Sequence, residues 1–166
     1  MKPESTPEPL LSPKRKVGIL GIGNTLAGDD GAGIVAARLL EQVCPRDPRL
    51  LFDVLEGDLY AISEFLPQVE RFVFLDSVAG STPGHIVILR DQPRGWAPSF
   101  HQTSVASVMN GFQALNFVSP FPDWEIWGVT IHTPRNFRVG LSPVVEKAVV
   151  EMVERLKRHL ECSILH

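Results

Sequence analysis

The sequence predicts an α/β fold built on a mostly parallel sheet, and two observations lead to this class. Up to residue 75, apolar segments and helical patterns alternate in the order strand, helix, strand, helix, strand. Such alternation is typical of parallel strands joined by right-handed crossovers. The next apolar segment, 85–90, follows the third strand after too few residues for a parallel return. It therefore predicts an antiparallel strand, which we place at an edge of the sheet.

The individual elements follow from apolar periodicity and from their end signals. The first strand is predicted over 16–22, an apolar run that ends at Gly23, and the helix over 31–43 has an aspartate just before it as a candidate N-cap. The third strand, 71–75, is nearly all apolar, which indicates burial on both faces. The last helix is predicted to begin with a serine at its N-cap and a proline at N1, which are typical residues for these positions. The other predicted elements are strands 50–55 and 125–132, a short helix 58–66, a helix 104–116, and the last helix, opened by Ser142 and Pro143.

Composition limits the classes of function. The 166 residues carry a formal net charge of −3, which gives no basic surface for nucleic acid or for an anionic membrane. No apolar run is long enough to span a bilayer, and the start of the chain lacks a secretory pattern. We expect a flexible Pro-rich tail over 1–14, a single domain over 15–166 and a cytoplasmic location. Cys44 and Cys162 are expected to be two reduced thiols.

The stretch GIGNTLAGDDGAG, residues 21–33, is a glycine-rich turn between a strand and a helix. A dinucleotide site is disfavoured because the third glycine comes late and Asp29 and Asp30 would repel a pyrophosphate. A P-loop is excluded because no Gly-Lys-Ser/Thr follows. Two interpretations remain open: the aspartates cap the helix, or one of them points into the cleft above the strand ends and binds a cation or a proton.

Two further residues are predicted to meet the glycine turn. Asp76 follows the third strand in FVFLDS, and His101 lies in the polar loop 91–103, which has to climb the height of the sheet before the next helix. Taken singly, Asp76 would ordinarily be interpreted as a helix cap, and His101 as a surface residue. The topology, however, brings Asp30, Asp76 and His101 to one edge from three segments. Two carboxylates and an imidazole suit a first-row divalent ion with open coordination positions.

Four stretches together resemble the [NiFe]-hydrogenase maturation proteases. They are GIGNTLAGDDGAG, FLDSV, HQTS before a helix, and VGLSPVVEKAVV, and the resemblance covers about residues 16–160 in order. It implies a three-layer α/β/α sandwich around a twisted, mostly parallel five-stranded sheet with one antiparallel strand. It also implies a cytoplasmic endopeptidase that removes a C-terminal extension from the nickel-loaded precursor of the hydrogenase large subunit.

By motif position, the resemblance implies that Asp30, Asp76 and His101 are the metal ligands and the catalytic residues. The nickel would be supplied by the precursor, and the protein would act as a monomer. The sequence contains neither HExxH nor GxSxG, and neither cysteine falls near the predicted edge. The metal would then polarise the scissile carbonyl or activate a water, with Asp29 as a candidate proton acceptor.

Several alternatives stay open at the level of sequence. Glu56 is either a rim contact or a solvated cap, and His132 is either a fourth site residue or an ordinary loop residue. A non-catalytic nickel-checkpoint protein could use the same three ligands and cut nothing. A related α/β peptidase could act on a different protein. A nucleotide-binding oxidoreductase is disfavoured by the glycine spacing and by Asp29 and Asp30.

Overall fold

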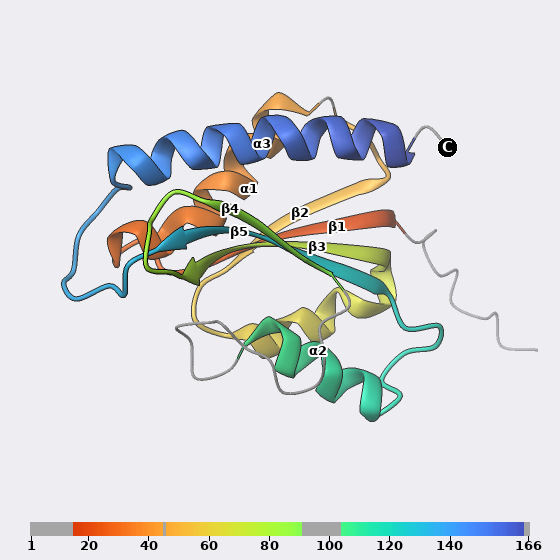
Figure 1. Ribbon diagram of the computed structural model, residues 1–166. Coiled ribbons are helices and arrows are strands. Elements are labelled where there is room, and N and C mark those ends of the chain that lie inside the picture. Colours follow the sequence, from red (N-terminus) through yellow and green to blue (C-terminus); the bar gives the residue numbers. More distant parts are fainter. Residues whose placement is uncertain (1–14, 45, 91–103, 165–166) are drawn as a thin grey trace, which may run out of the picture.

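The computed structural model describes residues 15–44, 46–90 and 104–164, and it shows a central five-stranded sheet between two helical layers (Figure 1). The strands lie in the order β2-β1-β3-β5-β4. β1, β2, β3 and β5 run parallel to their neighbours, and β4 pairs antiparallel with β5 at the edge. The predicted fold class is confirmed, including the position of the antiparallel strand. The strands are β1 Arg15–Ile22, β2 Leu50–Leu55, β3 Val69–Ala79, β4 Ile86–Arg90 and β5 Asp123–Ile131.

The helical layers enclose two separate apolar cores. Helices α1 (Ala32–Val43) and α3 (Pro143–Ile164) lie on one face of the sheet, as Figure 1 shows. The opposite face carries α2 (Val105–Ala114) and two 3₁₀ turns, η2 (Leu59–Glu64) and η3 (Leu66–Gln68). Alternate residues of β3 join the two cores, because successive side chains of a strand point to opposite faces. Both faces of this strand are therefore buried, as its apolar sequence predicts.

Three local predictions differ from the structure. β3 continues to Ala79, because β5 goes on pairing with it as far as Ile131, so Asp76 lies within the strand and not after it. The short helix expected over 58–66 is instead the 3₁₀ turn η2, capped by Asp58, followed by η3 with its proline. The aspartates before α1 do not cap it: its N-cap is Gly31, with no side-chain cap. The proposed tail, 1–14, lies outside the described residues.

The glycine turn brings α1 unusually close to the sheet. A Cβ built on Gly33 would collide with the backbone carbonyl oxygens of Leu75 in β3 and Ile22 in β1. These oxygens belong to paired strands and have little freedom to move. The missing side chain at this position therefore sets the distance between the first turn of α1 and the carboxyl ends of β1 and β3.

None of the helices in the described ranges is both long enough and apolar enough to cross a membrane.

Gly33→Ala tests this close approach. We expect the free energy of unfolding to fall by about 3 kcal/mol, because the new methyl group overpacks against backbone atoms. Gly111→Ala is the matched control: this glycine lies in α2, and a Cβ there meets nothing within 4 Å. The control should gain about 0.5–1 kcal/mol from helix propensity. Urea unfolding of the two variants measures both changes, and equal stabilities would contradict the packing argument.

Candidate active site at the carboxyl edge of the sheet

Asp30 lies in a tight 3₁₀ turn, η1 (Gly28–Gly31), that connects the glycine-rich loop after β1 to α1. The loop folds back on itself: Asn24 Oδ1 accepts from the amide of Leu26 at 2.9 Å, and the amide of Asn24 donates to the carbonyl of Asp30 at 3.4 Å. Gly23, with a φ of 149°, lies against that same carbonyl, where a Cβ would collide. The backbone of the turn thus holds Asp30 over the end of β1.

Asp30 and Asp76 are both buried and both contact Ser77. Each aspartate is 4% exposed. Ser77 Oγ donates to Asp30 Oδ1 at 2.9 Å, and the backbone amide of Ser77 donates to Asp76 Oδ1 at 2.7 Å. Within the described residues, the structure thus brings the two aspartates to one edge of the sheet, where they share Ser77 as a neighbour. Strand alternation places Asp76 on the face of the sheet that α2 covers, and Ser77 on the face of α1.

Burial changes the acidity of Asp76. Desolvation raises its pKa from 3.8 to about 8; the hydrogen bond from the Ser77 amide opposes the rise, and the nearby Asp30 carboxylate adds to it. A cation close to Asp76 would oppose this rise, because it favours the charged form of the carboxylate. A divalent ion fits this donor set, because carboxylate oxygens are ligands for first-row divalent ions and because such an ion would displace the proton.

Asp29 has a different hydrogen-bond partner from Asp30. Its Oδ1 accepts from the amide of Ser142 at 2.6 Å, and its Oδ2 accepts from the Ser142 hydroxyl at 2.8 Å. Both bonds connect the glycine turn to the residue before α3, although the two segments are far apart in sequence. The structure therefore favours a structural role for Asp29 over the proton-accepting role that the sequence suggests.

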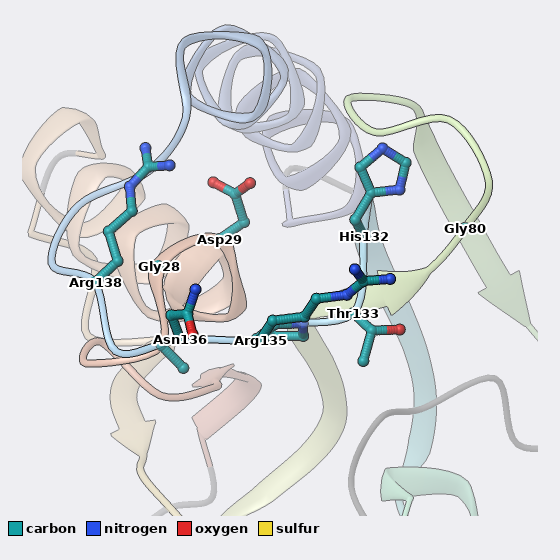
Figure 2. A pocket seen from close by; sticks show the side chains of 10 residues that line it. Gly28, Asp29, Gly80, His132, Thr133, Arg135, Asn136 and Arg138 are labelled. Carbon is teal, nitrogen blue, oxygen red and sulfur yellow. The ribbon is translucent and has the colours of Figure 1, made fainter.

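Two adjoining cavities open at this edge. The acidic cavity, about 480 Å³, contains Asp30 and Glu56 in its wall, and Glu56 Oε1 accepts from Thr25 Oγ1 at 2.8 Å. Glu56 is thus a rim contact. The basic cavity, about 640 Å³, has Arg135 and Arg138 in its wall and is shown in Figure 2. His132 follows β5 and lines the basic cavity, and it is not part of the wall of the acidic cavity. Residues common to both walls are Ala27, Thr133 and Pro134.

The third predicted ligand, His101, lies in 91–103, outside the described residues. Description resumes at Ser104, whose side chain accepts from the amide of Ser107 and caps α2. Within the described ranges, no three His, Cys, Asp or Glu side chains gather closely enough to hold a metal. The triad of Asp30, Asp76 and His101 therefore stays a prediction, with two of its members brought together.

Sequence reasoning missed Ser77 and the two arginines of the basic cavity. Nothing in the pattern FLDSV separates Ser77 from its neighbours, because its role depends on Asp30, 47 residues earlier. Arg135 and Arg138 left a weak signal. They lie in PRNFR, between a strand and a helix, where two cations stand close together without an acidic residue among them.

Comparisons with known proteins relate the chain to proteins of hydrogenase maturation. No family model matches the chain. A hydrogenase expression/formation protein HupD from Rhodobacter capsulatus is 32% identical over 120 residues, covering 66% of this chain and 54% of that protein, so the match spans about half of the relative's length. A second HupD, from Bradyrhizobium diazoefficiens, is 26% identical over 162 residues, covering 88% of this chain and 82% of that protein.

Among solved structures, the hydrogenase maturating endopeptidase HybD from E. coli superposes with a TM-score of 0.71 at 25% identity, over 89% of this chain and 93% of that one. The fold is therefore an α/β/α sandwich like that of HybD. The two HupD relatives and this likeness to HybD support the hydrogenase maturation protease family for the chain.

The raised pKa of Asp76 predicts how stability changes with pH in the metal-free protein. Between pH 3.8 and about 8 the folded state holds a proton at Asp76 that the unfolded state has lost. The contribution of this group to stability is therefore full below that window and falls as pH rises through it. Asp76→Asn cannot ionise, so the variant should gain stability relative to the parent from pH 5 to pH 8.5.

Thermal unfolding of both proteins across that range measures the difference. Asp53→Asn is the control, because Asp53 is exposed on β2. A constant difference between the Asp76→Asn variant and the parent at every pH would contradict a buried, protonated Asp76.

Proposed function

We propose that this protein is an endopeptidase that removes a C-terminal extension from the nickel-loaded precursor of a [NiFe]-hydrogenase large subunit. The observation that carries the proposal is the pair of buried carboxylates, Asp30 and Asp76, which both contact Ser77, with Asp30 in the wall of a cavity at the carboxyl edge of the sheet. The likeness to HybD, itself described as a hydrogenase maturating endopeptidase, supports the reaction class.

In this proposal the nickel belongs to the substrate. Asp30 and Asp76 would contact the ion carried by the precursor, with His101 as the third protein ligand. The bound ion would polarise the carbonyl of the scissile bond or lower the pKa of the attacking water. The chain's own contribution is to orient the two carboxylates through Ser77 and the glycine turn, and to hold them in a site with little water.

The acidity of Asp76 gives the proposal a means of control. With its pKa near 8, Asp76 is neutral at physiological pH until a cation displaces its proton. The cost of losing this proton weakens the binding of free metal ions. When the precursor carries the nickel ion, contacts between the two protein surfaces add to the binding energy of the ion. The loaded precursor would therefore fill the site where a free ion would not.

We keep one rival of another class, a nickel-checkpoint protein that binds the loaded precursor through the same residues and cuts nothing. Both proposals predict binding, and only the endopeptidase predicts a loss of mass from the precursor. A monomer acting in the cytoplasm remains our expectation for either case.

The central prediction concerns the two carboxylates. Asp76→Asn and Asp30→Asn should each lower the rate of cleavage by about 100-fold or more, because an amide is a poor ligand for the ion and carries no charge. Intact-mass spectrometry of a candidate large-subunit precursor, nickel-loaded or nickel-free, measures the loss of the extension over time.

Asp53→Asn serves as the control, since it removes a carboxylate from the exposed face of β2. Cleavage of the loaded precursor by the parent and by this control, but not by the site variants, supports the endopeptidase. Binding of the loaded precursor without any change of mass would replace it with the checkpoint protein. Full activity in Asp76→Asn would refute the proposed role of the pair.

Ser77→Ala tests whether the hydroxyl between the carboxylates positions Asp30. We expect cleavage to fall about tenfold, because the partners of metal ligands typically matter to that degree, while the fold is retained. Nickel titration of the parent protein and of the variant should show a parallel loss of the weak affinity for the free ion, which a purely structural defect would not produce. Ser81→Ala is the matched control, because Ser81 is exposed in the β3–β4 turn. Unchanged nickel affinity in Ser77→Ala would contradict the positioning role.

A further inference from the structure

The basic cavity is not used by the proposed chemistry, and its chemical character differs from that of its neighbour. It has a volume of about 640 Å³, within the range of ligand pockets in proteins. Figure 2 shows Arg138 on one side and Arg135 and His132 on the other, with the backbone of the glycine turn between them. Both arginines come from the segment between β5 and α3.

The charges in this cavity favour an anion. Within the described residues, neither Arg135 nor Arg138 forms an ion pair. Asp29 also lines the cavity, but both of its carboxylate oxygens accept hydrogen bonds from Ser142. Arg135 and Arg138 thus line a hollow whose described carboxylate is already engaged, and each exposed guanidinium group has five N–H donors to offer an anion.

The position of the basic cavity relative to Asp30 is fixed by backbone hydrogen bonds. The amide of Arg138 donates to the carbonyl of Leu26 at 2.9 Å, and the amide of Gly28 donates to the carbonyl of Arg138 at 2.7 Å. These bonds attach the arginine-bearing segment to the same turn that carries Asp30 in η1. A chain bound at Asp30 can therefore continue past Thr133 and Pro134, which belong to both walls.

We propose that the basic cavity is a substrate subsite that binds a carboxylate of the precursor's C-terminal extension. The inference rests on the proposed function, because it places the metal-bearing segment of the precursor at Asp30. Guanidinium groups form paired, charge-assisted hydrogen bonds with carboxylates and recognise them by shape as well as by charge. The cleft then has an acidic half for the metal ion and a basic half for the peptide that is to be removed.

The carboxylate has two possible sources, an acidic side chain of the extension or its free C-terminus. Three synthetic peptides of the extension distinguish them: the native form, a form with every Asp and Glu changed to the amide, and a form with an amidated C-terminus. Each carries a fluorophore at its N-terminus. Fluorescence anisotropy with the full-length protein measures their affinities without requiring cleavage.

The variants are Arg135→Gln, Arg138→Gln and the double change, with Arg158→Gln as the matched control. Arg158 is exposed on α3, about 20 Å further along the helix from its start. We expect the native peptide to bind the double variant about tenfold more weakly than the parent protein, and the control to match the parent. Added salt should weaken binding of the native peptide more than binding of the amide form that lacks the recognised carboxylate.

The amide form that loses affinity identifies the source of the carboxylate, and the double variant should no longer distinguish that form from the native peptide. Equal binding of all three peptides by the parent protein, or no binding up to about 1 mM, would overturn the subsite. The cleavage assay separates this failure from failure of the proposed function. If the parent and the double variant cleave the loaded precursor with the same KM, the subsite proposal is refuted and the endopeptidase proposal stands. If the parent protein binds the peptides selectively but cleaves no precursor, the endopeptidase proposal is refuted and the subsite proposal stands.

Discussion

The close contact between the first turn of α1 and the ends of β1 and β3 determines the site. Because Gly33 has no side chain, the helix lies directly on the backbone carbonyls of Ile22 and Leu75. The preceding 3₁₀ turn is then held above the sheet, and Asp30 comes within hydrogen-bonding distance of Ser77. A helix displaced by one methyl group would move Asp30 away from β3. The close backbone packing at Gly33 thus controls the position of the Asp30 carboxylate.

The second consequence is electrostatic. Burial disfavours the charged form of Asp76 and raises its pKa, and the conflict with the nearby Asp30 carboxylate adds to the rise. The structure tolerates the conflict because each carboxylate receives one hydrogen bond from Ser77. In the proposed reaction the conflict has a use: the site gains most from a cation that a protein partner delivers, and least from ions free in solution.

The third consequence is the arrangement of charge along the cleft. The segment between β5 and α3 is bound to the glycine turn by backbone hydrogen bonds at Arg138, and Asp29 ties the same turn to Ser142. Acidic and basic cavities therefore share a wall and keep their relative positions. A cleft of this kind suits an extended peptide with a metal ion at one point and a carboxylate further along.

The sequence by itself determined the order of the elements, the antiparallel strand β4 and the two aspartates of the site, because apolar periodicity and connection length are local properties of the chain. It also placed Asp30 and Asp76 at one edge, since parallel strands end together. Tertiary structure alone decided that Asp29 binds Ser142, that Ser77 joins the carboxylates, and that β3 runs on past Asp76. Each of these depends on a partner distant in the chain, a neighbouring strand or a residue in another element, and no local pattern encodes a contact of that kind. The same limit explains why the cavity around Arg135 and Arg138 emerged only once the glycine turn, Gly80 and the segment after β5 were placed together.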